Sequence, residues 1–183
     1  MKAIILAGGR GKRLRPVTDY VPKPLIPIKN IPIIEWQIKY LKKFGISEVI
    51  ICSGYKTEMI ENYLSNKKLG IKITFSVENT PLGTGGAIKK AGKKINEKSF
   101  VVINGDIITN IDLKKLLKKE NSIAAIQLKT KFGILQITDD KIIKFDEKKE
   151  KLFTLKFRNT KWYSIDSFKD MEECTLEVEK IIK

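Results

Sequence analysis

The chain has 183 residues, of which 42% are hydrophobic and 31% charged, a composition typical of one folded globular domain rather than of a disordered chain. No apolar run is long enough to cross a bilayer. The chain has no histidine and only two cysteines, far apart, which excludes a zinc site, a Ser-His-Asp triad and a Cys-His pair within it.

The formal charge of +15 comes almost wholly from lysine. Many of these lysines stand in pairs at helical spacing, such as Lys89-Lys90 and Lys93-Lys94, without clustered arginines or interleaved aromatic residues. We interpret them as solvated helix faces and expect no nucleic-acid or membrane partner. A nucleic-acid-binding protein stays an alternative, and a steep salt dependence of binding would reveal it. The sparse cysteines predict a cytoplasmic location.

Residues 3–7 form a continuous apolar run that ends in glycines, which predicts a buried parallel strand followed by a tight loop. Residues 8–30 contain four prolines and cannot form a regular helix, and a loop of this length indicates function. Pro32 suits the first turn of a helix, and Gly45 suits its C-terminal cap. Between them, apolar side chains follow at helical spacing: Ile34, Ile38, Leu41 and Phe44.

Strands and helices then alternate along the chain. Further strands are expected at residues 48–52, 71–77, 100–103, 123–128, 134–138 and 142–145. Further helices are expected at residues 56–64, 83–91, 112–119 and 167–182, with Asp112 as a cap. The alternation predicts an α/β fold: a single three-layer domain, residues 1–183, with a Rossmann-like, mostly parallel (mixed) sheet and helices on both faces. Ligands of such sheets bind outside the carboxyl ends of the strands.

The first loop is rich in glycine: Gly8-Gly9-Arg10-Gly11-Lys12-Arg13 follows the first strand. A glycine-rich turn in this place exposes backbone N–H groups to a polyphosphate. Two common phosphate motifs do not fit: Leu6 and Arg13 break the Walker A pattern, and Leu14 breaks the dinucleotide-binding fingerprint. Further along the loop, prolines on both sides of Lys23 restrict its backbone, so that the lysine is presented in a fixed direction.

The loop as a whole reads Leu6-Ala7-Gly8-Gly9-x-Gly11-x-Arg13-Leu14-x-Pro16-x-Thr18-x-x-x-Pro22-Lys23-Pro24-Leu25-x-Pro27. It closely resembles the signature of sugar-phosphate nucleotidyltransferases, the family of glucose-1-phosphate thymidylyltransferases and mannose-1-phosphate guanylyltransferases. Lys12 stands where the family usually has threonine. The resemblance implies catalytic roles for Arg13, which neutralises the leaving pyrophosphate, and for Lys23, which contacts the acceptor's phosphate. It implies a group of nucleotide-binding residues: Leu6, Ala7, Gly8, Gly9 and Gly11.

Two later segments extend the resemblance. Pro81-Leu82-Gly83-Thr84-Gly85-Gly86-Ala87 resembles the segment that lines the base and sugar pocket, most of all in guanylyltransferases that act on mannose or heptose 1-phosphates. Pro81, Gly83 and Thr84 are therefore expected to bind the nucleotide, although glycines here can also simply start a helix. By the same resemblance the acceptor-binding residues are Gly133, Glu147 and Lys148. The last two also suit an ordinary charged surface.

The expected cofactor is Mg²⁺. Asp106, in Asn104-Gly105-Asp106 at a strand end, resembles the family's metal-binding aspartate, and a carboxylate there suits Mg²⁺ with phosphate oxygens. An ordinary turn aspartate is the alternative. The family places an acidic residue shortly after a tryptophan near the C-terminus; here Ser164 follows Trp162 by two positions, and Asp166 by four. Asp166 is a candidate second ligand, or it caps the final helix with Ser167.

Between Lys148 and Trp162 this short variant has only about a dozen residues, where relatives insert further elements, so its acceptor pocket is expected to be more open. The expected function is transfer of a nucleoside monophosphate from an NTP (GTP, dTTP/UTP or CTP) to a sugar 1-phosphate or another small phosphorylated acceptor, with release of pyrophosphate. The alternatives are a cytidylyltransferase acting on phosphocholine or inositol phosphate, and a non-catalytic NTP-sensing domain. A homo-oligomer is compatible with the sequence.

Overall fold

The computed structural model describes residues 1–119, 121–126, 137–138, 141–142, 153–157 and 160–182. They form two compact units: Met1–Ile108 with Tyr163–Lys183, and Thr109–Trp162. Compact units within a chain need not be separate domains, so the single domain stays a prediction. No helix in the described part of the chain is long and apolar enough to cross a membrane.

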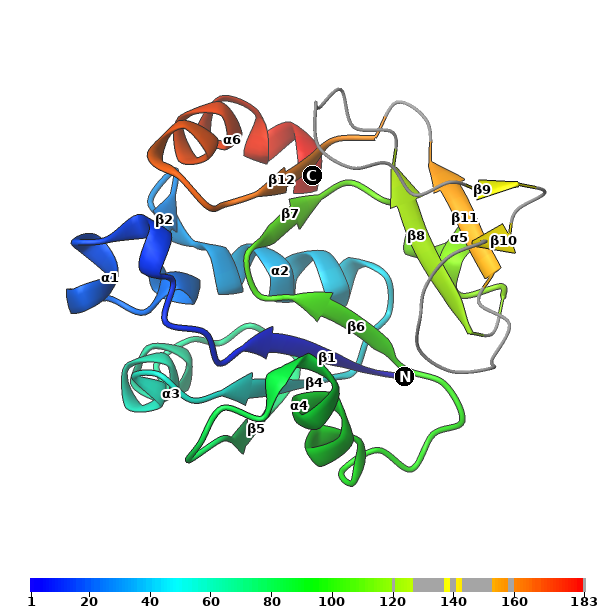
Figure 1. Ribbon diagram of the computed structural model, residues 1–183, viewed down its shortest axis with the longest axis horizontal. Coiled ribbons are helices and arrows are strands. Elements are labelled where there is room, and N and C mark those ends of the chain that lie inside the picture. The colour runs from blue at the N-terminus through cyan, green and yellow to red at the C-terminus, as the bar shows by residue number, and fades with distance from the viewer. Residues whose placement is uncertain (120, 127–136, 139–140, 143–152, 158–159, 183) are drawn as a thin grey trace. The chain divides into compact units, whose positions relative to one another are not determined.

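The centre of the first unit is a sheet of four parallel strands (Figure 1). The strands are β1 (Lys2–Ala7), β4 (Glu48–Ser53), β5 (Lys72–Val77) and β6 (Val101–Asn104). Their order is β5-β4-β1-β6, so the chain moves outward from β1 to β5 and then returns to the other side of β1. The carboxyl ends of β1 and β6 therefore flank the point where the strand order reverses, which is where ligands bind in open α/β sheets.

Helices connect these strands: α2 (Ile33–Lys43), α3 (Thr57–Ser65) and α4 (Gly83–Gly92). Right-handed crossovers put α2 and α3 on one face of the sheet, and α4, whose connection returns past β1, on the other. On that second face, Ala87 and Ala91 of α4 pack against Ile4, Ile50 and Cys52. The strand residues that point to the opposite face are fully buried as well: Ala3, Ile5, Val49 and Ile51. The predicted three-layer α/β fold is confirmed.

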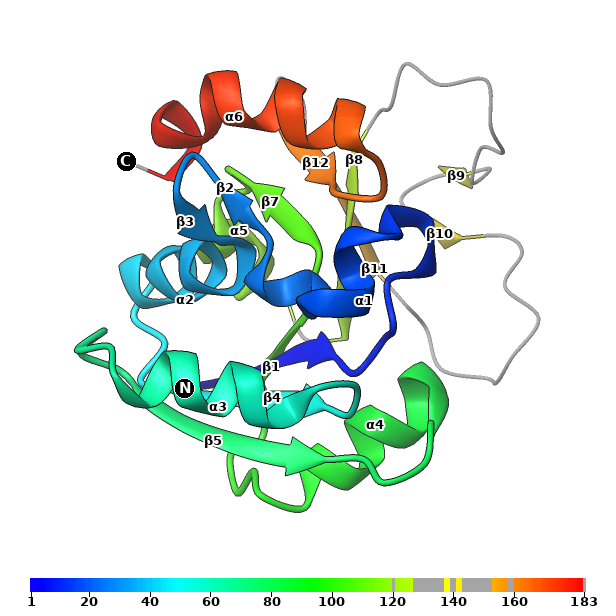
Figure 2. The ribbon, with the colours of Figure 1, turned by 90° about the vertical axis from the view of Figure 1, so that its left-hand side faces the viewer.

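The proline-rich segment 8–30 is mostly irregular, as expected, but it contains short helical turns. They are η1 (Lys12–Leu14), α1 (Val17–Tyr20) and η2 (Lys23–Leu25), followed by the short strands β2 (Pro27–Ile28) and β3 (Ile31–Pro32). The C-terminal helix α6 (Phe168–Ile182) packs against β2 (Figure 2). Its buried residues Cys174, Val178 and Ile181 share a core with Leu14 and Ile28. The final helix fixes the segment that carries the glycine turn.

The short strands β2 and β3 were not predicted, and three further features, within residues 107–119 and 162–164, also differ from the sequence prediction. The strands β7 (Ile107–Thr109) and β12 (Trp162–Ser164), which pair with each other, were not predicted because each has only three residues. The helix predicted at 112–119 is shorter and corresponds to α5 (Leu113–Leu116). Its cap is as predicted, since Asp112 Oδ1 accepts a hydrogen bond from Lys114 N at 3.0 Å.

The second unit contains a mixed sheet in the order β8-β11-β10-β9. Its strands are β8 (Ser122–Ile126), β9 (Ile137–Thr138), β10 (Lys141–Ile142) and β11 (Phe153–Phe157). β8 and β11 are parallel, and the other pairs are antiparallel. β11 was not predicted, and much of the two strands predicted at 134–138 and 142–145 lies outside the described residues.

Candidate active site

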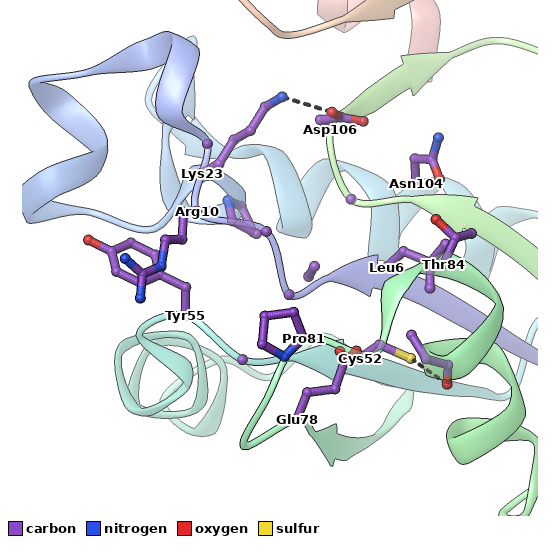
Figure 3. Close-up of a pocket in the computed structure, with 18 of the residues that line it drawn as sticks. Leu6, Arg10, Lys23, Cys52, Tyr55, Glu78, Pro81, Thr84, Asn104 and Asp106 are labelled. Carbon is purple, nitrogen blue, oxygen red and sulfur yellow. Dashed lines mark hydrogen bonds and ion pairs between the residues drawn. The ribbon is translucent and has the colours of Figure 1, made fainter.

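A cavity of about 730 Å³ lies at the carboxyl ends of the four parallel strands (Figure 3). The residues that follow each strand line the cavity: 8–14 after β1, 54–56 after β4, Glu78 and Asn79 after β5, and 105–106 after β6. The start of α4 adds Gly83 and Thr84. The volume is typical of a small-molecule site. The fold therefore places the cavity at the reversal point of the sheet.

The glycine turn is built around Gly11, which has a left-handed φ of 63°. A Cβ atom there would stand 3.0 Å from Thr18 Cγ2 and 3.1 Å from Lys23 Cβ. The Gly11 carbonyl accepts hydrogen bonds from Leu14 N at 2.9 Å and from Thr18 Oγ1 at 3.0 Å. Only glycine suits both the backbone angle and this close approach, which brings the turn against Lys23.

We expect Gly11→Ala to lower the free energy of unfolding by about 1–2 kcal/mol, because alanine is strained in the left-handed region. Chemical denaturation measures this loss. The matched control is Gly9→Ala, because a Cβ atom at Gly9 meets nothing within 4 Å and its φ is not positive. Equal stability of the two variants would contradict the assigned role of Gly11.

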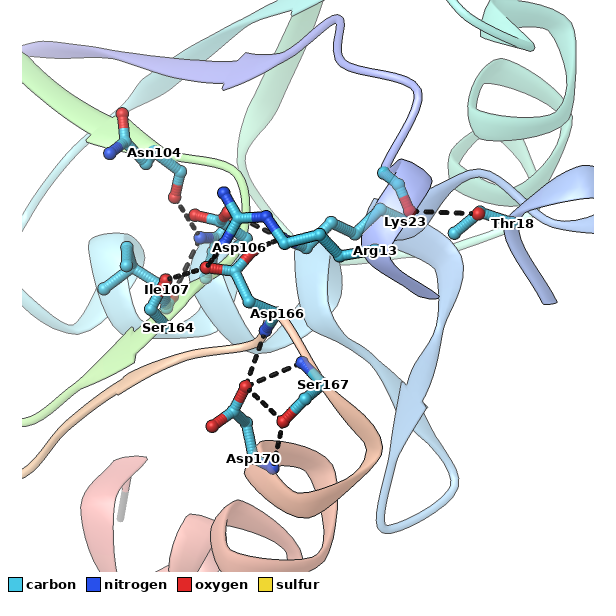
Figure 4. A network of polar contacts seen from close by, with 12 residues as sticks. Arg13, Thr18, Lys23, Asn104, Asp106, Ile107, Ser164, Asp166, Ser167 and Asp170 are labelled. Carbon is cyan, nitrogen blue, oxygen red and sulfur yellow. Dashed lines mark hydrogen bonds and ion pairs between the residues drawn. The ribbon is translucent and has the colours of Figure 1, made fainter. Parts of the chain in front are cut away.

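Lys23 brings the two predicted metal ligands together. Its Nζ donates to Asp106 Oδ2 at 2.7 Å and to Asp166 Oδ1 at 2.8 Å (Figure 4). Its side chain is only 12% exposed, so water screens these contacts little. Lys23 belongs to η2, Asp106 to the turn between β6 and β7, and Asp166 to the segment before α6. One ammonium group therefore marks a point that both carboxylates face.

Asp166 has two further partners. Arg13 Nη1 lies 2.9 Å from its Oδ2, and Ser164 Oγ donates to the same oxygen at 3.1 Å. Burial by itself raises the pKa of Asp166, but the hydrogen bonds and charges of Lys23, Ser164 and Arg13 outweigh it and hold the pKa below its ordinary value. Asp166 is therefore a carboxylate at neutral pH. Ser164 therefore helps to hold the Asp166 carboxylate in place and in its charged form.

The helix cap is made by other groups. Ser167 Oγ accepts from Asp170 N at 3.2 Å, and Asp170 Oδ2 accepts from Ser167 N at 2.7 Å. This reciprocal pair is a capping box at the start of α6. The carboxylate of Asp166 is thus not used for the cap and faces Lys23 instead (Figure 4).

The opposite side of the cavity carries Glu78 and Pro81 (Figure 3). Glu78 Oε2 accepts from Leu82 N at 3.0 Å, which fixes the carboxylate beside the start of α4. Its Oε1 would lie 3.5 Å from a Cβ atom on Gly8, so the carboxylate stands next to the glycine turn. Glu78 was missed by sequence reasoning. Its place directly after a strand of the predicted parallel sheet was the one available signal.

Three other residues that line the cavity were also missed: Arg10, Cys52 and Tyr55. Tyr55 OH donates to Thr18 O at 3.0 Å, and the Arg10 guanidinium lies 5.7 Å from the Tyr55 ring centre. These contacts tie the glycine turn to the end of β4.

Cys52 is buried, and burial together with the charge of Glu78 raises the pKa of its thiol to about 11. The thiol is therefore neutral and unsuited to nucleophilic chemistry.

The predicted site residues within the described part of the chain all line this cavity. They are Leu6, Ala7, Gly8, Gly9, Gly11, Arg13, Lys23, Pro81, Gly83, Thr84, Asp106 and Asp166. The predicted acceptor-binding residues Gly133, Glu147 and Lys148 lie outside the described residues. The more open acceptor pocket stays a prediction, because residues 149–161 are described only in part.

Comparisons with known proteins agree with this geometry. The nucleotidyl transferase family model matches residues 2–163. A D-glycero-alpha-D-manno-heptose 1-phosphate guanylyltransferase from Aneurinibacillus thermoaerophilus is 46% identical over 156 residues, which cover 81% of this chain and 68% of that protein. The protein of the same name from Campylobacter jejuni subsp. jejuni is 44% identical over 154 residues, which cover 81% of this chain and 69% of that protein. The solved structure of HddC from Yersinia pseudotuberculosis has a TM-score of 0.85 and 25% identity, with 96% of this chain and 98% of that chain covered.

Proposed function

This chain belongs to the nucleotidyl transferase family, and we propose that it transfers GMP from GTP to the 1-phosphate of D-glycero-α-D-manno-heptose or a closely related sugar, with release of pyrophosphate. Two relatives with 46% and 44% identity that carry this activity in their names support the substrate pair. The observation that carries the proposal is the convergence of Lys23, Asp106 and Asp166 beside the glycine turn.

The donor set fits Mg²⁺. Among the described residues, no group of three or more Asp, Glu, His or Cys side chains could hold a metal alone. Two carboxylates that face one point are nevertheless the protein share of a typical Mg²⁺ site, which phosphate oxygens and water complete. Asp106 and Asp166 would hold the ion. When bound, Mg²⁺ supplies charge neutralisation at the phosphates of the nucleotide.

The residues of the chain align the reactants and offset charge. The acceptor phosphate is largely a dianion at neutral pH, so its oxygen can attack the α-phosphorus without a protein base. As that bond forms, the bond from the α-phosphorus to the β-phosphate oxygen breaks, and pyrophosphate leaves with the electron pair. Lys23 offsets charge on the acceptor phosphate, and Arg13 offsets charge on the pyrophosphate. Alignment and charge neutralisation suffice for this class of reaction.

Glu78 is the candidate for selecting the base. Guanine presents N1–H and N2–H₂ as adjacent donors, and a carboxylate accepts only, so one side chain can accept both. Uracil and thymine present a single N–H between two carbonyl groups. The carbonyl oxygens are acceptors, so a carboxylate placed beside them would repel them. The position of Glu78 beside Pro81 and the glycine turn supports guanine over these bases.

We expect Glu78→Gln to lower kcat/KM for GTP by about ten- to a hundredfold, which is the effect of losing one bidentate contact to a base. The values for UTP and CTP should fall less, so that the preference for GTP shrinks. The glutamine oxygen can still accept from Leu82 N, which keeps the local fold. Glu58→Gln, an exposed change on α3, is the control. Unchanged selectivity in Glu78→Gln would remove this residue from base recognition.

The experiment that tests the function is a matrix of four NTPs against sugar 1-phosphates and phosphoalcohols with Mg²⁺, scored by pyrophosphate release. We expect the highest rate with GTP and a heptose or mannose 1-phosphate. A preference for CTP with phosphocholine or inositol phosphate would establish the cytidylyltransferase alternative. NTP binding without pyrophosphate release from any pair would identify an NTP-sensing domain and contradict the proposal.

A further inference from the structure

Gln37 is a buried polar residue on α2, and the reaction outlined above gives it no role. Its neighbours Trp36 and Ile38 are 7% and 0% exposed, and Gln37 itself is 2% exposed. An amide in such a place destabilises the fold unless its hydrogen bonds are made. The hydrogen-bond partners of the Gln37 amide therefore indicate its role.

Both hydrogens of the Gln37 amide are used on one turn. Nε2 donates to Asn104 O at 2.7 Å and to Ile107 O at 2.8 Å. Both partners are carbonyl oxygens, which can only accept, so the nitrogen must face them and the amide cannot be flipped. The Oε1 atom has no hydrogen-bond partner among the described residues. The turn alone thus accounts for the amide's position.

The two residues between these carbonyls are Gly105 and Asp106. Gly105 N donates to Leu6 O at 2.8 Å, and a Cβ atom on Gly105 would lie only 2.5 Å from that oxygen. Asp106 O accepts from Ile165 N at 3.0 Å, directly before Asp166. With Gln37, these bonds fix the backbone on both sides of Asp106, next to Asp166 (Figure 4).

We infer that Gln37 is a positioning residue: its amide holds the turn 104–107 so that the Asp106 carboxylate stays in line with Lys23 and Asp166. The inference rests on the proposed function, in which Asp106 holds the metal. Glutamine suits the place because a single nitrogen carries two donors. Methionine has a similar length but no donor, and glutamate has two acceptors in their place.

The test begins with Gln37→Met. We expect kcat to fall by about ten- to a hundredfold, as for a small displacement of a reacting group, while KM for GTP changes by less than about threefold. In a protein that already carries Asp106→Ala, adding Gln37→Met should not lower kcat further, because no carboxylate is left at position 106 to be positioned. The control is Ile38→Val, which removes one buried methylene from the same helix and should keep kcat within about twofold.

Mn²⁺ alone, followed by electron paramagnetic resonance, gives a readout independent of activity. We expect Gln37→Met to weaken Mn²⁺ binding by about tenfold, as for other residues that orient a metal ligand. A wild-type protein that releases no pyrophosphate would overturn the proposed function, while this binding comparison would still decide the role of Gln37.

Three results would overturn the inference: kcat and Mn²⁺ affinity within about twofold of wild type in Gln37→Met, an equal loss of kcat in the Asp106→Ala background, or the same loss of kcat in Ile38→Val. If Gln37→Met does not fold, Gln37→Glu is measured in the same way. Failure of both variants to fold would assign Gln37 to stability alone and would also overturn the inference.

Discussion

Replacing Lys23 by alanine is expected to lower kcat by on the order of 10²–10³, the usual effect of removing one charged group that stabilises a transition state. The ammonium lies 2.7 Å from Asp106 and 2.8 Å from Asp166. Its removal takes away the cation proposed to offset charge on the acceptor phosphate, whereas Asp166 keeps Arg13 as a partner. Steady-state pyrophosphate release measures the loss.

The matched control is Lys29→Ala. Lys29 forms a surface ion pair with Glu179 at 2.9 Å and has 46% of its side chain exposed. Exposed pairs contribute little to stability, so this variant should behave like the wild type. A Lys23→Ala protein with near-normal kcat would contradict the role of Lys23 in turnover.

Replacing Asp106 by asparagine is expected to lower kcat by on the order of 10³, because a metal's contribution to such reactions amounts to several kcal/mol. Asparagine keeps the size of the side chain but removes the charge that attracts Mg²⁺. Higher Mg²⁺ concentrations should restore part of the rate, so a metal titration is the measurement.

The control for Asp106→Asn is Asp19→Asn, which removes an exposed aspartate whose side chain pairs with Arg15 at 3.0 Å. This variant should keep the Mg²⁺ dependence of the wild type. If Asp106→Asn showed the wild-type rate and metal requirement, Asp106 would not be a metal ligand.

The glycine turn and the parallel sheet were accessible from the sequence because their signals are local. A continuous apolar run followed by glycines predicts a buried strand and a tight exit, and β1 and the left-handed Gly11 confirm this. The alternation of strands and helices was sufficient for the fold. The strands β7 and β12 were missed because three-residue strands carry almost no periodicity and depend on pairing between distant segments.

The site depends on contacts that sequence spacing does not encode. Lys23 and Asp166 are 143 positions apart, and only the fold brings them within 2.8 Å. The resemblance to the family named both residues, and the Ser167–Asp170 contacts show that the side chain of Asp166 does not form the cap. Its role as a metal ligand stays a prediction. Glu78 and Gln37 belong to no local motif. For Glu78 the sequence offers only its place directly after a predicted strand. For Gln37 it offers no signal, because its partners Asn104 and Ile107 lie 67 and 70 positions away.

The most direct test of the central claim uses a heptose 1-phosphate whose non-bridging phosphate oxygens are ¹⁸O, incubated with GTP and Mg²⁺. If the acceptor phosphate attacks the α-phosphorus, mass spectrometry will find all the label in the nucleotide sugar and none in the pyrophosphate. Label in the pyrophosphate, or GMP formed without any nucleotide sugar, would contradict the account.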